Sequence, residues 1–125
     1  MKKIIFTKNA PAPIGPYSQA VLADGMLYCS GQIPLDAMTG AIINGSIAEQ
    51  TEKVCQNIAA VLNAVGFNFE NVVKTICFLV SMGDFAEFNA VYEKYFISKP
   101  ARSCVAVKEL PKGVSVEIEV IATIF

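Results

Sequence analysis

The chain has 125 residues, of which 54% are hydrophobic and 17% charged, and its net charge at pH 7 is −1. This length predicts a single domain over residues 1–125, and a near-neutral chain whose basic residues never run longer than Lys2-Lys3 argues against nucleic-acid binding. Histidine is absent, which excludes histidine-containing catalytic triads, His-Cys zinc sites and ribonuclease chemistry that uses two histidines.

The apolar residues do not form a membrane span, because no run reaches the ~18–20 residues that such a span requires. A non-membrane chain this apolar is expected to bury part of its surface against copies of itself. The four cysteines stand singly without a C-x-x-C motif, and Ile4-Ile5-Phe6 is too short for a secretory signal. We therefore expect reduced thiols and a cytoplasmic location.

The first predicted element is a β-hairpin, in which Gln19–Ala23 and Met26–Ser30 flank the turn dipeptide Asp24-Gly25. A polar, glycine-containing loop over residues 31–45 follows it. Ser46-x-x-Glu49 then forms a capping box at the start of a long amphipathic helix, which Gly66 closes.

Residues 72–80 are rich in β-forming residues and predict a strand. A second helix is expected to open at Asp84, with Glu87 three residues later as its capping partner. Its inner face is aromatic, and Pro100 prevents the helix from continuing.

The last two predicted strands alternate in character and carry unexpected charges. In residues 100–107, Arg102, Cys104 and Ala106 share one face. In residues 114–125, one face is wholly apolar from Val116 to Ile124, whereas the other carries Glu117 and Glu119. Because an unpaired charge on a buried strand is costly, these charges are either paired with each other across neighbouring strands or wait for a charged ligand.

The predicted element order is β-β-α-β-α-β-β, which indicates an α+β fold with two helices on one face of a mixed sheet. The helices cover only one face of that sheet. The other face would still hold apolar residues among its charges, and self-association is the simplest way to cover it.

The chain resembles the RidA/YjgF family, whose members deaminate reactive enamine and imine intermediates. The resemblance spans nearly all of the sequence, and the joint order and spacing of its motifs are specific. The motifs are Ile14-Gly15-Pro16-Tyr17, Ser30-Gly31-Gln32-Ile33-Pro34, Phe88-Asn89-x-x-Tyr92, Pro100-Ala101-Arg102-Ser103-Cys104, and Leu110-Pro111-Lys112 followed by Val116-Glu117-Ile118-Glu119. The resemblance implies a chorismate-mutase-like fold and a homotrimer with a central barrel of sheets and ligand clefts between subunits.

The resemblance also implies roles for individual residues. Arg102 would bind the substrate carboxylate, since a guanidinium can grip it through two parallel hydrogen bonds. Spacing cannot choose between Glu117 and Glu119, and the resemblance favours Glu117 as the acid/base. The resemblance implies that Cys104 acts mainly through its backbone. Covalent chemistry at its thiol is not favoured, since no histidine, and no basic neighbour other than Arg102, is available to activate it. The residues implied to line the pocket are Tyr17, Ser30, Gly31 and Asn89.

On this interpretation the charged strands form one wall of a cleft whose opposite wall is another subunit. The implied function is cofactor-free and metal-free hydrolysis of 2-imino acids such as 2-iminobutanoate and 2-iminopropanoate. The alternative is a module that binds a small carboxylate and regulates a partner without turnover. Ribonuclease or translation-inhibitor activity fits less well, given the missing histidine and the weak positive charge. The connection over residues 97–99 is shorter than in several relatives, which affects the rim of the cleft.

Overall fold

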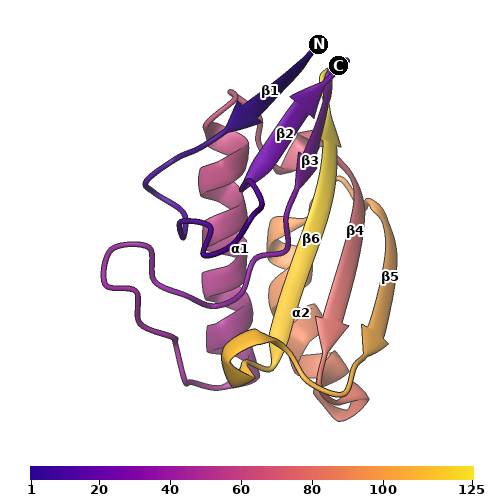
Figure 1. Ribbon diagram of the computed structural model, residues 1–125. Coiled ribbons are helices and arrows are strands. Elements are labelled where there is room, and N and C mark those ends of the chain that lie inside the picture. Colours follow the sequence, from indigo (N-terminus) through magenta and orange to yellow (C-terminus); the bar gives the residue numbers. More distant parts are fainter.

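The computed structural model describes all 125 residues, and both helices pack on the same face of one six-stranded sheet (Figure 1). The strands are β1 (Lys2–Ile5), β2 (Ala20–Ala23), β3 (Met26–Cys29), β4 (Val72–Leu79), β5 (Ala101–Ala106) and β6 (Val116–Thr123). The helices are α1 (Ile47–Asn63) and α2 (Phe85–Tyr95), and the short 3₁₀ turns are η1 (Phe69–Asn71), η2 (Met82–Asp84) and η3 (Pro111–Gly113). The predicted α+β class is confirmed. Neither helix is long and apolar enough to cross a membrane.

The strand order in the sheet is β1-β2-β3-β6-β4-β5, and only β4 and β5 run parallel. The predicted element order was incomplete because it lacked β1, which pairs antiparallel with β2 from Lys2↔Ala23 to Ile5↔Ala20. A four-residue strand that begins with two lysines has little β-pattern of its own. Such lysines are typical of a sheet edge, where they discourage pairing with other chains.

The predicted hairpin is confirmed, with Asp24 and Gly25 as its turn. Both residues have positive φ angles, 50° and 75°, as a two-residue hairpin turn that matches the strand twist requires. The turn sets the register Ala23↔Met26 between β2 and β3.

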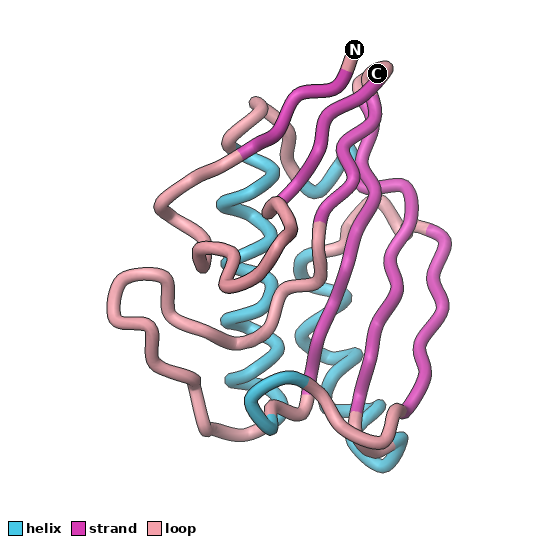
Figure 2. Tube along the Cα trace, viewed as in Figure 1, coloured by secondary structure: helices cyan, strands magenta, loops and turns pink.

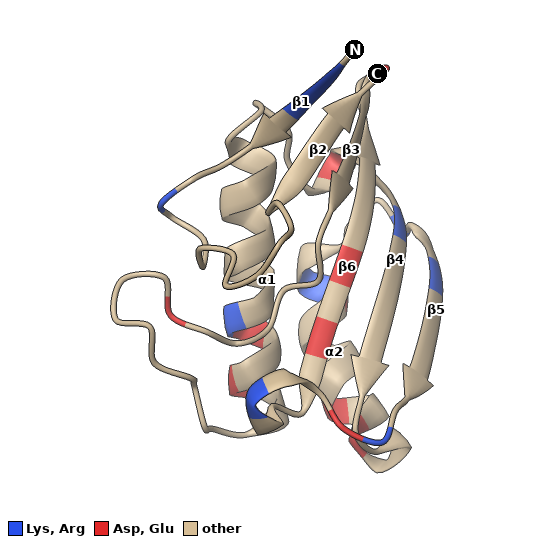
Figure 3. Ribbon diagram, viewed as in Figure 1, with Lys and Arg blue, Asp and Glu red and all other residues tan.

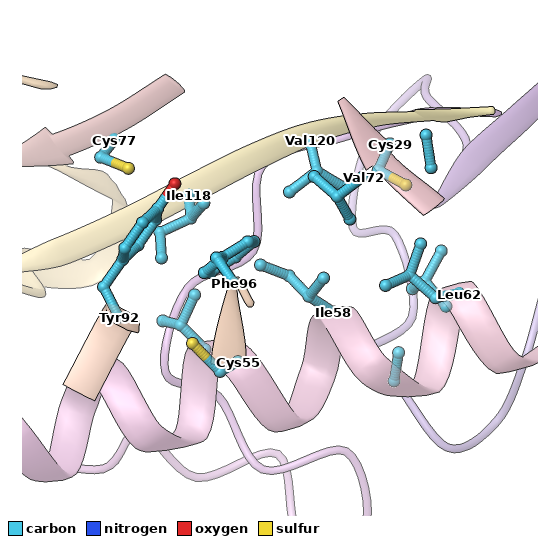
Figure 4. Packing of buried hydrophobic residues seen from close by; sticks show 14 of the residues in the cluster. Cys29, Cys55, Ile58, Leu62, Val72, Cys77, Tyr92, Phe96, Ile118 and Val120 are labelled. Carbon is cyan, nitrogen blue, oxygen red and sulfur yellow. The ribbon is translucent and has the colours of Figure 1, made fainter. Parts of the chain in front are cut away.

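The predicted capping box at the start of α1 is also confirmed. The Glu49 N–H donates to Ser46 Oγ at 3.1 Å, and the Ser46 N–H donates to Glu49 Oε1 at 2.9 Å. After the helix, Gly66 adopts a φ of 77°, the left-handed conformation that ends many helices. The apolar side of α1 faces the sheet, with Cys55, Ile58 and Leu62 opposite Val72, Ile118 and Val120 (Figure 4).

The predicted cap of α2 is wrong in its detail. Asp84 has a helical conformation (φ −89°, ψ 0°) and its side chain makes no capping hydrogen bond, because η2 already winds the chain before the helix begins. Glu87 instead accepts a hydrogen bond from the backbone N–H of Ala48, at 3.0 Å. The Glu87 carboxylate therefore accepts from an N–H of the first turn of α1 that has no partner within that helix, and this bond links the N-terminal ends of the two helices.

One face of the sheet is uncovered, and the tubes in Figure 2 show both helices behind the strands. A row of paired residues crosses this face from β1 to β6, namely Ile4, Val21, Tyr28 and Ile121. Ile4 and Tyr28 are 62% and 48% exposed, so apolar surface reaches solvent here. On the covered face, the alternate residues of β6 from Val116 to Ala122 are buried, as predicted. Ile124, which the pattern placed among them, is 64% exposed because β6 ends at Thr123.

Buried amides hold the long loops against this framework. The Gln19 side chain is hydrogen-bonded to the backbone of Thr7, Ala10 and Pro11. Asn57 of α1 donates to the carbonyl groups of Ile33 and Leu35, at 3.1 and 2.9 Å. These bonds fix the segments that carry Tyr17 and Gly31, two of the predicted site residues.

Candidate active site

Arg102 and Glu117 lie on opposite faces of the sheet. Strand β4 lies between β5 and β6. Figure 3 shows one basic residue on β5, in blue, and acidic residues on β6, in red. Arg102 is paired in register with buried Thr75 on the helix-covered face, whereas Glu117 is paired with Phe78 on the open face. The expectation that the two strands form one wall of a cleft is therefore wrong within a single chain. The proposed ion pair across neighbouring strands is excluded as well.

The guanidinium of Arg102 is held by helix α2. Its Nη1 donates to Asn89 Oδ1 at 2.7 Å, and its Cζ lies 4.7 Å from the ring centre of Tyr92 and 5.3 Å from that of Phe85. The ion pairs of the chain are elsewhere, between Lys53 and Asp36 and between Lys94 and Glu52. Arg102 thus has neutral partners only, and its positive charge stays available to an anion.

The groove beside Arg102, which we call the arginine groove, has a volume of about 650 Å³. Its lining residues are Asn89, Tyr92, Glu93, Phe96, Ile97, Lys99, Pro100 and Arg102. Two of them belong to the short connection after α2, where Ser98 Oγ donates to the carbonyl groups of Phe69 and Val72. The connection is therefore anchored, and its residues form the rim of this groove.

Cys104 lies on the same face as Arg102, paired in register with Cys77. Burial raises the pKa of the Cys104 thiol, and the positive charge of Arg102 lowers it by less. The thiol is thus protonated near neutral pH and is a poor nucleophile.

The backbone of Cys104 faces the free edge of the sheet. Val107 N–H donates to Leu79 O at 2.8 Å, so odd-numbered residues of this segment direct their backbone groups towards β4. Successive residues of a strand in a parallel pair alternate in this respect. The N–H and C=O of Cys104 therefore point away from β4, where they can bind a ligand.

Glu117 lies in a second groove, on the open face, which we call the glutamate groove. It has a volume of about 390 Å³ and is lined by Ile14, Tyr17, Ser30, Gly31, Ile33, Pro111, Lys112 and Glu117. Burial raises the pKa of the Glu117 carboxyl, and the nearby Glu119 raises it further. Glu119 does not line this groove. Of the two glutamates, which spacing could not separate, only Glu117 lines this groove.

Gly31 packs directly against the Glu117 carboxylate. Gln32 and Ile118 exchange backbone hydrogen bonds of 2.8 and 3.2 Å, which fixes this segment against β6. A Cβ on Gly31 would collide with the Glu117 carboxylate, so no larger residue fits here without displacing it. The Gly31 N–H has no partner within the chain and remains free to donate.

Ser30 lines the glutamate groove but has no free hydrogen-bond donor. Its hydroxyl donates to Ser18 O at 2.6 Å, and its N–H donates to Gln19 O at 2.9 Å. Both of its donors are engaged within the chain. Ser30 therefore lines the glutamate groove, as the resemblance implies, but the free donor at this strand end is the Gly31 N–H.

Tyr17 follows a tight turn in which its N–H donates to Gly15 O at 2.9 Å, and its side chain is 52% exposed at the glutamate groove. Lys112 also lines this groove and has a φ of 57°, which is unusual for a lysine. Sequence reasoning gave Lys112 no role, although it stands in the Leu110-Pro111-Lys112 motif. Phe85 was also given no role at the site, although its ring centre lies 5.3 Å from the guanidinium carbon of Arg102.

The predicted site residues thus form two groups. Arg102, Asn89 and Cys104 lie on the helix-covered face at the β5 edge, whereas Tyr17, Ser30, Gly31 and Glu117 surround the glutamate groove. No group of three or more Cys, Asp or Glu side chains is close enough to hold a metal ion. One group offers an anion anchor, and the other offers a carboxylate that can exchange protons.

Comparison with known proteins matches residues 7–124 to the family described as endoribonuclease L-PSP. A RutC family protein of Pyrococcus horikoshii is 53% identical over 98% of both chains. The 2-iminobutanoate/2-iminopropanoate deaminase of Bos taurus is 48% identical over 98% of this chain and 90% of its own. The structure of Escherichia coli TdcF with bound serine has a TM-score of 0.93 at 39% identity, and it covers 98% of this chain and 99% of its own.

Proposed function

This chain belongs to the endoribonuclease L-PSP family, which includes the YjgF and RidA proteins, and we propose that it hydrolyses 2-imino acids or their enamine tautomers. The substrates would be 2-iminobutanoate and 2-iminopropanoate, released by pyridoxal-phosphate enzymes, and the products 2-ketoacids and ammonia. The observation that carries the proposal is that Arg102 and Glu117 each lie in an open groove without an ion-pair partner. The name of the bovine relative supports the choice of reaction.

The complete site would form between two copies of the chain. A 2-imino acid is too small to reach both faces of a sheet, so Arg102 and Glu117 of one chain cannot act on the same molecule. If the β5 edge of one copy packs against the open face of the next, the arginine groove of one chain meets the glutamate groove of the other. Repetition of this contact in a closed ring would produce a homotrimer with three such sites, with the open faces covered in its centre.

The reaction needs an anion anchor, an oriented water and one acid/base group. Arg102 would hold the substrate carboxylate through two parallel N–H donors, with Gly31 N–H as a further donor. With the imine nitrogen protonated, Glu117 would take a proton from water as the water oxygen bonds to the imine carbon, and the π electrons of the C=N bond would move to nitrogen, which becomes an –NH₂ group. Glu117 would then give that proton to the –NH₂ group. The C–N bond would break with its electrons leaving on ammonia, and the remaining hydroxyl would form the C=O of the ketoacid and release its proton to Glu117 or water.

The raised pKa of Glu117 suits these two roles, because a carboxyl that titrates closer to neutral pH both accepts and returns a proton readily. The free backbone groups of Cys104 would orient the water. Positioned acid/base groups of this kind contribute on the order of 10²–10⁴ to the rate. The mechanism uses only residues of this chain and water.

We place the reaction in the cytoplasm. The four cysteines, Cys29, Cys55, Cys77 and Cys104, are all unpaired, and free thiols are typical of a reducing compartment.

A second candidate function is capture of a small carboxylate without turnover. The serine bound to the Escherichia coli relative favours it, because serine carries a carboxylate. Arg102 serves this function as well as it serves hydrolysis. Glu117 separates the two candidates, since pure carboxylate binding gives no reason for a second carboxylate nearby.

The test generates 2-iminobutanoate with a threonine dehydratase and traps the remaining imine with semicarbazide. Wild type is expected to divert imine to 2-oxobutanoate, and Arg102→Ala and Glu117→Gln are expected to lose this activity. If wild type does not speed release of the ketoacid but binds 2-oxobutanoate, the binding module is the correct function. If Glu117→Gln keeps the full rate, the acid/base assignment is wrong while the activity stands.

A further inference from the structure

Three residues on one face of α2 surround the guanidinium of Arg102. Phe85, Asn89 and Tyr92 are spaced four and three residues apart, so they line up along the helix surface. The rings of Phe85 and Tyr92 contact the guanidinium, and Asn89 Oδ1 accepts its Nη1–H at 2.7 Å. A long side chain on an edge strand would otherwise sample many rotamers. These contacts together restrict both the plane and the rotation of the guanidinium.

Tyr92 is itself fixed by the core. Its hydroxyl is 2.8 Å from Thr75 Oγ1, its ring stacks on Phe96 with centres 4.2 Å apart, and it is only 8% exposed. Figure 4 shows its hydroxyl end close to the sheet, beside Cys77 and Ile118. Thr75 lies fully buried on β4 as the register partner of Arg102. The support under Arg102 therefore rests on the middle of the sheet.

We propose that Asn89 and Tyr92, with Thr75 beneath them, are positioning residues that hold Arg102 ready for a carboxylate. A guanidinium has five N–H donors, so Asn89 leaves enough of them for a bidentate grip. Because Asn89 is neutral, it orients the cation without neutralising it. This inference deepens the proposed function and rests on Arg102 as the carboxylate anchor. Asn89 then acts through Arg102 and is not a ligand of the substrate.

The first test replaces Asn89 by Asp or by Ala and measures the Kd for 2-oxobutanoate by calorimetry. Asp has nearly the same shape and keeps the contact with Arg102, but its charge competes with the ligand for the guanidinium. We expect Asn89→Ala to weaken binding about tenfold, as loss of a charge-assisted hydrogen bond does. Asn89→Asp should weaken binding more than Asn89→Ala. A purely structural role predicts the opposite order, which would overturn the proposal.

The second test separates the ring of Tyr92 from its hydroxyl. Tyr92→Leu removes the ring under the guanidinium, and we expect about a fivefold loss of affinity, as for a partly desolvated cation–π contact. Tyr92→Phe keeps the ring and should restore most of this loss. Thr75→Val should behave like Tyr92→Phe, because it removes the same hydrogen bond from the other side. Equal affinity of the Leu and Phe variants would contradict a role for the ring.

A readout that needs no ligand completes the test. In ¹⁵N NMR spectra of wild type, the guanidinium of Arg102 should give resolved N–H signals with slow rotation about its C–N bonds. Asn89→Ala should average these signals, and unchanged signals would contradict the proposal. Thermal melts of each variant show whether it is folded at the temperature of the measurement.

Failure of this inference and failure of the proposed function give different results. If Arg102→Ala binds 2-oxobutanoate and hydrolyses 2-iminobutanoate like wild type, both are overturned. If Arg102→Ala loses binding while Asn89→Asp and Tyr92→Leu retain it, only the positioning role falls. If the variants weaken binding in the expected order but wild type hydrolyses no imine, the positioning role stands and the hydrolase does not.

Discussion

Replacement of Arg102 by lysine keeps the positive charge but removes the planar guanidinium. An ammonium cannot make two parallel bonds to a carboxylate, and it has no flat face to stack between Tyr92 and Phe85. Loss of one charge-assisted hydrogen bond is worth about 1.5–3 kcal/mol, and loss of the stacking about 0.5–1 kcal/mol. The sum of about 2–4 kcal/mol corresponds to a roughly 30- to 1,000-fold loss of affinity.

Because the carboxylate is held equally in the ground state and the transition state, this loss should fall mainly on KM and less on kcat. The assay is steady-state release of 2-oxobutanoate from 2-iminobutanoate at several concentrations of the imine. Lys94→Ala is the control, since it removes a positive charge from α2 at its ion pair with Glu52, outside the arginine groove. A KM for Arg102→Lys within threefold of wild type would refute the bidentate grip.

Three further predictions concern the glutamate groove. Gly31→Ala should lower kcat by about 100-fold or more, because the new methyl group displaces the Glu117 carboxylate; an unchanged kcat would show that the rate does not depend on where this carboxylate lies. Glu119→Gln should move the acid limb of the kcat/KM–pH profile to lower pH, because Glu119 raises the pKa of Glu117 and the reaction begins with ionised Glu117; a shift to higher pH would contradict this. Glu117→Gln should raise Tm at pH 7 and not at pH 4. A carboxyl whose folded pKa is raised stabilises the fold below its unfolded pKa, and this stabilisation is lost as pH rises through the folded pKa; equal melting at pH 7 would count against the pKa shift.

Features that depend on local sequence were predictable here. The capping box of Ser46 and Glu49 and the turn at Asp24-Gly25 appear in the structure as the sequence indicates. The same kind of signal failed at Asp84-x-x-Glu87, because η2 gives Asp84 a helical conformation before α2 begins. Glu87 instead accepts a hydrogen bond from Ala48 N–H of α1, 39 residues away in the chain. Strand β1 was missed because its pairing with β2, and not its own pattern, makes it a strand.

The relation between Arg102 and Glu117 could not be derived from alternation. Alternation shows which residues of one strand share a face, but it does not say how two separate strands are aligned. That alignment depends on β4, which lies between them and pairs Arg102 with Thr75 but Glu117 with Phe78. The resemblance to a family named the residues, and the sheet register revealed that one chain cannot bring them together.

Mixing two inactive variants shows whether each site lies between two copies of the chain. Arg102→Ala and Glu117→Gln chains, unfolded together in equal amounts and refolded, should recover about one quarter of wild-type activity. If each site takes its arginine from one chain and its glutamate from another, random assembly leaves about one site in four with both residues intact. Arg102→Ala mixed with the double variant contains no intact arginine and should stay inactive. If the first mixture is no more active than its separate components, Arg102 and Glu117 of different copies do not form a common site.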